Sequence, residues 1–293
     1  MLRYTRGMVA LAETVEAAAL GNAGWEARLD LSFRRDATRS VLASRRHSGP
    51  LRVQKALHPE GPEVCQAIVV HPPGGIVGGD RLEIAVEVGP HAHAQLTTPG
   101  AAKWYRSGGA DAVARTRLEV GEAGVLEWLP QESLLFDGAR AAITLRIDLA
   151  AGARFVGWDI VGLGRTASGE RFATGRLHQT IELRHDGELA WCERTVLDGG
   201  SPALQSGAIL AGAPAFGTMI VAGVRVADAT LAACRSIVCV NGDCAVTRLP
   251  HVLVARYRGA SAIDARTYFA LQWHALRPIV VGRAAVAPRI WNT

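Results

Sequence analysis

A strand, a tight turn and a second strand recur four times in the middle of the chain. The first strand of each unit has apolar residues at alternate positions, which is the period of a strand with one buried face. The last residues of these strands stand 32, 29 and 34 positions apart, and alanine or glycine follows four positions later. These pairs are Val88 with Ala92, Val120 with Gly124, Leu149 with Ala153, and Leu183 with Gly187. Such irregular repetition is typical of strands stacked layer on layer, each covering its neighbour's apolar face.

The repeat predicts a mainly β protein, folded as a superhelical stack of strands of the β-solenoid kind. A β-sandwich built from hairpins would give a similar pattern and stays open as an alternative. Helical patterns occur only in the C-terminal third, at about residues 203–210, 227–235 and 262–277. Pro278 is expected to end the last helix. Helices confined to this region do not fit a chain of alternating βαβ units.

The length and composition are those of a globular protein with an extended core. The chain has 293 residues, of which 49% are hydrophobic and 20% charged. We predict a flexible N-terminal segment over residues 1–24 and a single β-rich domain over residues 25–293. No signal peptide is evident, and no apolar stretch approaches the roughly 20 residues that a membrane span needs. A cytoplasmic location without membrane contact is therefore expected, and the five cysteines are expected to be reduced thiols.

Arginine supplies almost all of the positive charge. The formal net charge is +5, and only Lys55 and Lys103 among the 32 basic residues are lysines. Arginine binds carboxylates through two parallel hydrogen bonds, so acidic protein partners fit this composition. A bias in genomic base composition would give the same preference, and both interpretations stay open. No arginine run is dense enough to indicate nucleic-acid binding.

The stretch from His71 to Ser107 specifies its backbone more strongly than any other. Its first part, HPPGGIVGGD (71–80), has two prolines that force an extended entry and four glycines that permit positive φ. A strand pattern follows, and then a turn and a cation–aromatic cluster, TTPGAAKWYRS (97–107). The glycines do not fit a phosphate loop, because no Gly-Lys-Ser/Thr follows and a strand replaces the helix. Two interpretations of residues 71–80 therefore stay open: a structural turn, or a protein-binding loop that carries His71 and Asp80.

These two segments resemble the UreD family of urease accessory proteins, called UreH in some organisms. Four more segments match the family in the same order: LEWLPQE (126–132), GLGR (162–165), ER (193–194) and PRIW (288–291). Together they cover about residues 25 to 291. The segment before Trp25 lies outside these motifs.

The resemblance implies a non-enzymatic accessory factor that is mainly β and binds urease apoprotein. It implies that the protein acts with a helical accessory protein of the UreF type and a GTPase of the UreG type that carries nickel. A dimer within that complex is a further possibility that the resemblance leaves open. Nickel would be a transient cargo delivered to a carbamylated lysine of urease, with no tightly bound cofactor. An internal channel for the metal has been proposed for the family.

Carboxylates within apolar segments of the sequence are the candidate channel residues. Glu127, Asp159 and Glu193 interrupt strand-like apolar runs, and a buried carboxylate is costly unless it is paired or meets water or a metal. Structural ion pairs with nearby arginines are one interpretation. If these residues instead converge with Asp80 and Glu170, they would form an acidic passage for a divalent ion. His71 would add an imidazole to such a path.

Two clusters are candidate partner-binding surfaces, since tryptophan and arginine are common interface anchors. They are Lys103, Trp104, Tyr105 and Arg106 after the second turn, and Arg289 and Trp291 near the end of the chain.

Weaker signals for metal binding have bland alternatives. His91 and His93 would share one face of a strand and could bind a metal together with a third ligand from a neighbouring strand. Two solvated histidines on a turn are the simpler interpretation. Cys234, Cys239 and Cys244 lack the CxxC spacing of a structural zinc site and are interpreted mainly as small hydrophobic residues. No catalytic motif is present. A metal-dependent hydrolase on a β scaffold and a pure scaffold between the GTPase and urease remain as competing functions.

Overall fold

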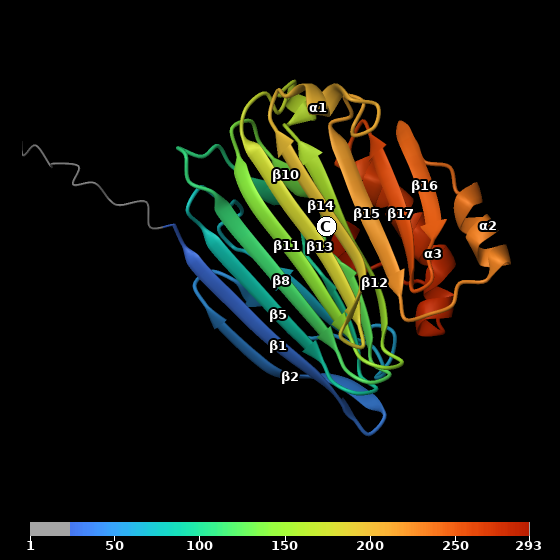
Figure 1. The fold of residues 1–293 in the computed structure, drawn as a ribbon. Coiled ribbons are helices and arrows are strands. Elements are labelled where there is room, and N and C mark those ends of the chain that lie inside the picture. The colour runs from blue at the N-terminus through green and yellow to red at the C-terminus, as the bar shows by residue number, and fades with distance from the viewer. Residues whose placement is uncertain (1–23, 293) are drawn as a thin grey trace, which may run out of the picture.

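Two β-sheets face each other in a computed structural model that describes residues 24–292 (Figure 1). The predicted N-terminal segment lies, apart from Gly24, outside the described residues. In spatial order, the first sheet holds β14 (Glu188–Asp198), β13 (Arg176–His185), β11 (Arg140–Leu149), β8 (Ala112–Val120), β5 (Arg81–Val88), β1 (Glu26–Asp36) and β2 (Arg39–Ser48). The second sheet holds β16 (Gly242–Arg248), β17 (Val252–Gly259), β15 (Ala215–Ala222), β12 (Arg154–Leu163), β9 (Val125–Leu129), β6 (His93–Thr97), β4 (Cys65–Val70) and β3 (Arg52–Val53). Two short strands, β10 (Ser133–Leu135) and β7 (Ala102–Trp104), pair with each other at its side.

The chain winds between the sheets and adds a strand to each sheet with every coil. Strands β5, β8, β11 and β13 are parallel neighbours in the first sheet, and β6, β9 and β12 are parallel neighbours in the second. About four stacked turns result, which confirms the predicted solenoid-like stack over the plain β-sandwich. After β13 the chain reverses into the antiparallel strand β14 and the coiling stops.

The predicted alignment of the repeats is correct for three layers and wrong for the fourth. Val88 lies opposite Val120, and Val120 lies opposite Leu149. In the fourth layer His185 lies opposite Leu149, and Leu183 lies opposite Ile147 instead. A shift of two residues leaves the same side chains facing inward, because the period of a strand is two. The apolar pattern alone therefore could not fix this register.

The turns that follow these strands stack on one another. His91, Ala123 and Gly152 have φ values of 58°, 51° and 66°, so the left-handed conformation recurs from layer to layer. Backbone bonds run between layers, such as His91 N to Glu122 O (3.0 Å) and Ala123 N to Ala151 O (3.0 Å). This stacking satisfies turn amides that would otherwise need water.

Among residues 24–292, three α-helices and two short 3-10 helices complete the fold. They are α1 (Pro202–Gln205), α2 (Asp228–Ser236), α3 (Ala262–Val281), η1 (Thr166–Ser168) and η2 (Arg289–Asn292). The helix expected at 203–210 is a single turn followed by irregular turns. The prediction that Pro278 ends the last helix was wrong. Pro278 lies inside α3, and the helix stops at Gly282 with φ 79°. Within residues 24–292, none of the helices combines the length and apolar character needed to cross a bilayer.

The core has two parts, one on each side of the second sheet. One fills the space between the sheets and includes Leu29, Leu118 and Leu126. The other lies between the outer face of the second sheet and α3, where Trp158 packs against Phe269 with ring centroids 6.4 Å apart. The second sheet is therefore buried on both faces, as its apolar strands require.

Two glycines allow a test of the coil geometry. Gly175 and Gly187 both have positive φ, 98° and 81°, but only at Gly175 would a methyl group overlap a backbone atom, the carbonyl oxygen of Ala139. We expect Gly187→Ala to lower the free energy of unfolding by about 1 kcal/mol through backbone strain. Gly175→Ala is expected to lower it by about 3 kcal/mol, because overlap adds to that strain. Urea unfolding measures both, and equal losses would contradict the packing at Gly175.

Candidate functional site

Two of the predicted carboxylates meet between the sheets. Asp159 comes from β12 of the second sheet and Glu193 from β14 of the first. Thr218, the partner of Asp159 in β15, directs its hydroxyl at both Glu193 oxygens, each 3.3 Å away. Arg256 Nη2 donates to Glu193 Oε2 at 3.1 Å. Glu193 is therefore held by an arginine, whereas no basic side chain within residues 24–292 forms an ion pair with Asp159.

Asp159 is poised to exchange a proton near neutral pH. Burial, together with the negative charge of Glu193, raises the pKa of Asp159 to about 6, against a hydrogen bond with Gln179 that lowers it. A carboxyl that is unpaired, half-buried and close to a second carboxylate is a group that a cation would stabilise.

Two hollows approach each other at this pair. Asp159 lines a cavity of about 310 Å³, whose other polar lining includes His71, Lys103 and Gln131 among mostly apolar side chains. Glu193 and Thr218 line a groove of about 330 Å³ with Asp243 and Cys244. Because Thr218 contacts Glu193 and pairs with Asp159, the two carboxylates stand between the cavity and the groove.

Asp80 and His71 have different surroundings, although both belong to the glycine-rich stretch. Asp80 is 4% exposed and accepts backbone hydrogen bonds from Trp25 N and Val77 N, each at 2.8 Å. Its carboxylate thus holds the turn and the start of β1. His71 lines the cavity, where burial lowers the pKa of its imidazole although Asp80 acts to raise it. A neutral imidazole is able to accept a metal ion.

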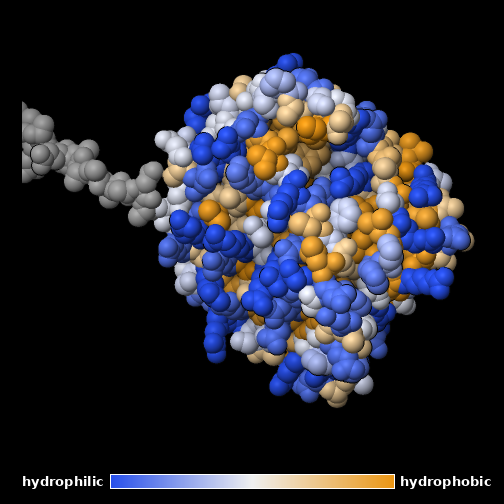
Figure 2. All heavy atoms as spheres, viewed as in Figure 1, coloured by the Kyte–Doolittle hydropathy of each residue, from blue (hydrophilic) through white to orange (hydrophobic). Residues whose placement is uncertain are grey.

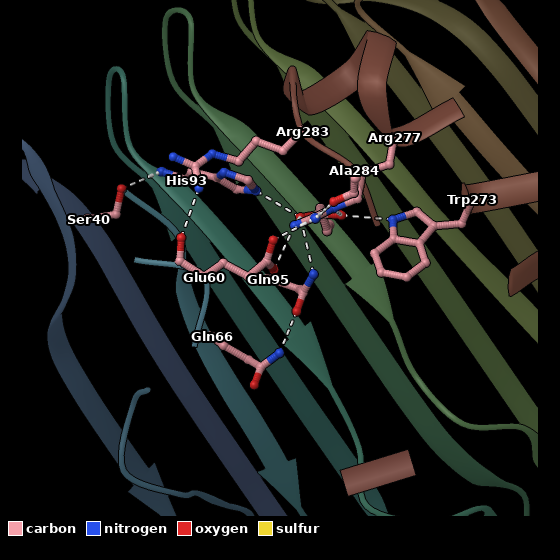
Figure 3. Close-up of polar contacts among 10 residues, drawn as sticks. Ser40, Glu60, Gln66, His93, Gln95, Trp273, Arg277, Arg283 and Ala284 are labelled. Atoms are coloured by element: carbon pink, nitrogen blue, oxygen red, sulfur yellow. Dashed lines mark hydrogen bonds and ion pairs between the residues drawn. The ribbon is translucent and has the colours of Figure 1, made fainter. Parts of the chain in front are cut away.

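Glu127 does not face the cavity; it lies on the other face of the second sheet, where it accepts hydrogen bonds from Trp273 and Arg277 of α3. Figure 3 shows Trp273 and Arg277 with the polar residues around them. Its side chain has no exposed surface. Its oxygens accept five hydrogen bonds: Oε1 from His93 Nε2 (2.9 Å), Gln95 Nε2 (3.2 Å) and Arg277 Nη2 (3.0 Å), and Oε2 from Trp273 Nε1 (2.8 Å) and Arg277 Nε (2.9 Å). The interpretation of Glu127 as half of a structural ion pair therefore fits its position.

Arg277 continues this network to the loop before β4. Its Nη1 and Nη2 lie 2.6 and 2.8 Å from the two oxygens of Glu60, and Arg283 binds the Glu60 carbonyl at 2.8 Å. Burial would raise the pKa of Glu127, but the hydrogen bonds from His93 and Arg277 and their charge outweigh it and lower the pKa to about 2. Glu127 therefore stays ionised at neutral pH and in moderately acidic solution.

His91 and His93 do not share one face of a strand, and only His91 is a solvated histidine on a turn. His91 is exposed in a turn with φ 58°, whereas His93 is buried against Glu127. The left-handed turn residue breaks the strand period on which the shared face depended. Sequence reasoning also missed Arg277 and Glu60; the signal for Arg277 was an arginine among the mostly apolar residues of the last helix.

Glu170 belongs to a surface turn, away from the other carboxylates. Its Oε2 lies 2.6 Å from Arg165 Nη2, and its Oε1 accepts hydrogen bonds from the amides of Asp137 (3.0 Å) and Arg165 (3.2 Å). The hydrogen bond from the Arg165 side chain lowers the pKa of Glu170. Glu170 thus organises η1 and its neighbours.

The first predicted partner-binding cluster is mostly accessible. Lys103, Tyr105 and Arg106 are exposed, and the Tyr105 ring meets Phe136 edge to face at 5.0 Å. Trp104 is 2% exposed and belongs to the core.

The second cluster is divided in the same way. Arg289 is exposed, but Trp291 packs against Trp158 and Trp273 with ring centroids 5.8 and 5.9 Å away. The Trp291 indole donates to Thr97 Oγ1 at 2.8 Å. Trp291 therefore fastens the end of the chain to the second sheet.

Within residues 24–292, no three His, Cys, Asp or Glu side chains are grouped closely enough to hold a metal ion. Cys234 is buried, while Cys239 and Cys244 are half-buried near the groove. The two carboxylates between the sheets are thus an incomplete ligand set.

Comparison with known proteins gives one consistent result. Residues 26–292 match the family described as UreD urease accessory protein. A urease accessory protein UreD from Dechloromonas aromatica is 54% identical over 273 residues, covering 92% of this chain and 95% of that protein. UreD proteins from Nitrosococcus oceani and Azoarcus sp. are each 49% identical, over 92% of this chain and 90% and 95% of their own lengths.

The buried network predicts a large stability loss when Glu127 loses its charge. Glu127→Gln leaves the fully buried guanidinium of Arg277 with one carboxylate, Glu60, so we expect the free energy of unfolding to fall by about 3–5 kcal/mol. Asp111→Asn is the matched control, because Asp111 and Arg140 form an exposed pair at 2.8 Å. It is expected to cost less than about 1 kcal/mol. Similar losses in urea unfolding would show that Glu127 is not the anchor of α3.

Removing the charge of Asp159 is expected to stabilise the protein, in contrast to removing that of Glu127, and the effect should depend on pH. Its pKa is raised from 3.8 to about 6 in the folded protein, so stability falls as the pH rises from about 4 to about 6. Asp159→Asn removes this cost, and we expect the variant to be more stable than the parent at pH 7.5 by up to about 3 kcal/mol. The difference should vanish near pH 4. Urea unfolding at both pH values checks this, and a difference independent of pH would refute it.

Proposed function

This chain belongs to the UreD family of urease accessory proteins and has a non-enzymatic role in urease maturation; from this premise we propose that it passes nickel through its interior toward urease. The observation that carries the proposal is the meeting of Asp159 and Glu193 between the cavity and the groove. The proposed route runs through the cavity lined by His71, past the two carboxylates, and out along the groove.

The chemistry of the pair suits an ion in transit. Carboxylate and hydroxyl oxygens are ligands that bind hydrated divalent ions, and imidazole also binds nickel. Asp159, Glu193 and Thr218 offer few ligands, and Arg256 already neutralises part of the charge of Glu193. Transport requires binding that is strong enough to admit an ion and weak enough to release it. An incomplete ligand set within mostly apolar walls meets both conditions.

The partners follow from the same proposal. An accessory role in urease maturation implies contact with urease and with other accessory proteins. We propose that these include a UreF-type helical protein and a UreG-type GTPase, and that the complex holds two copies of this chain. Lys103, Tyr105, Arg106 and Arg289 are accessible for such contacts. Asp80, Glu127 and Glu170 are assigned structural roles, because backbone amides or arginines hold their oxygens.

The competing function is a scaffold that presents the GTPase to urease and conducts nothing. The two functions differ in what the interior carboxylates do. A scaffold needs only the outer surface, whereas a conduit needs the charge of Asp159 and Glu193 while the surface stays unchanged.

Co-expression of this chain with the urease subunits and the other accessory proteins tests the proposal. We expect Asp159→Asn and Glu193→Gln to reduce urease activation at least tenfold, because an uncharged amide binds a divalent ion far more weakly than a carboxylate. Pull-down of the complex should remain at the level of the parent. Urease activity and bound nickel are measured in the same preparations.

Glu170→Gln and Asp111→Asn serve as controls, because both change a carboxylate outside the interior. They should leave activation unchanged. Full activation by Asp159→Asn and Glu193→Gln would refute the conduit and leave the scaffold function.

A further inference from the structure

Two half-buried thiols meet beside the groove. Cys239 lies in the loop after α2, and Cys244 lies in β16. Burial and the neighbouring Cys244 side chain both raise the pKa of the Cys239 thiol. The Cys239 thiol also contacts the Gly242 carbonyl at 3.3 Å, and the Cys244 thiol the Ile237 carbonyl at 4.0 Å. Each thiol thus contacts a backbone carbonyl that lies close in sequence to the other cysteine.

The loop between the two cysteines is held in a tight turn. Asn241 has φ 53°, and its carbonyl accepts a hydrogen bond from Ala260 N at 2.8 Å. Val238 and Val240 are 81% and 60% exposed. Hydrophobic side chains gather on the side of the molecule that carries β16 and α2 (Figure 2). Closing the loop covalently would fix how these two valines are presented to solvent.

We propose that Cys239 and Cys244 are a modification site that forms a reversible intramolecular disulfide. The backbone contacts by which each thiol reaches toward the other cysteine, the short loop between the two residues and their partial exposure carry the inference. The three other cysteines differ, because Cys65 and Cys234 are buried and Cys192 is exposed, with no second thiol recorded beside it in residues 24–292.

The reaction is an exchange with a low-molecular-weight disulfide such as oxidised glutathione. One cysteine thiolate attacks a glutathione sulfur, which forms a mixed disulfide and releases one glutathione thiolate. The second cysteine then attacks the protein sulfur of the mixed disulfide and releases the other glutathione. The protein loses two protons and two electrons, and one glutathione disulfide takes them up to become two glutathione thiols.

The surroundings make this exchange slow but do not prevent it. Burial and the neighbouring Cys244 raise the pKa of Cys239 to about 12, so its thiolate is rare at neutral pH. Asp243 and the tyrosines Tyr257 and Tyr268 also lie near the pair. The equilibrium, rather than the rate, is therefore the quantity to measure.

The full chain is incubated in buffers of reduced and oxidised glutathione until the oxidised fraction is constant, and free thiols are then alkylated. Trypsin releases both cysteines on one peptide, residues 236–248, because no lysine or arginine lies between Arg235 and Arg248. We expect this peptide to lose two hydrogens and to escape alkylation. The equilibrium constant should be at least tenfold larger in the folded chain than in urea, which corresponds to about 30 mV.

Cys192 is the internal control and should form only a mixed disulfide with glutathione. Cys239→Ser removes one thiol, so the remaining Cys244 should also form only a mixed disulfide. The proposal is overturned if both cysteines of the peptide remain alkylatable, or carry separate glutathiones, in a buffer in which Cys192 has reacted. An equal equilibrium constant in the folded and unfolded chain would overturn it as well.

Discussion

A fully buried ion pair between Glu127 and Arg277 joins the stacked strands to the last helix. Neither charge could be buried alone, because an isolated ion in an apolar interior costs several kcal/mol. Together with Glu60 and three neutral or weakly charged donors, the pair is satisfied on all sides. The pair fixes where α3 crosses the second sheet, and it keeps that sheet buried on both faces. Because α3 covers the outer face of the second sheet, the functional side chains of that sheet lie on its inner face, in the space between the two sheets.

That interior is unequal along its length. Most of it is an apolar core, with leucines and valines in register across the layers. Beside β14, where coiling stops, Glu193 crosses from one sheet toward Thr218 and Arg256 of the other. A solenoid that coiled further would have buried this edge under another layer. The reversal into β14 therefore leaves polar groups between the sheets, next to a groove that is open to solvent.

Local patterns in the sequence predicted the architecture and the residue types at the candidate site, but not which of those residues meet. Alternation and small turn residues set the stack, and three of four layers fell in the predicted register. Asp159 and Glu193 were recognised as costly carboxylates, and the structure brings them together. Glu127 looked identical in the sequence, yet it faces the opposite side of its sheet. Its partner Arg277 stands 150 positions later, so no local pattern shows the pair. Asp80 and Trp291 were given roles in transport and docking, but they bind the chain's own backbone and core. Such long-range partners leave no periodic signal.

The position of α3 in the chain also sets an order for folding during synthesis. Every strand leaves the ribosome before Trp273 and Arg277 do, so the outer face of the second sheet is made before its cover exists. Until then Glu127 has only His93 and Gln95 as hydrogen-bond partners, and the apolar residues around Trp158 lack the cover that α3 provides. The nascent protein thus passes through a stage with an exposed apolar surface, which is covered only when its last helix emerges.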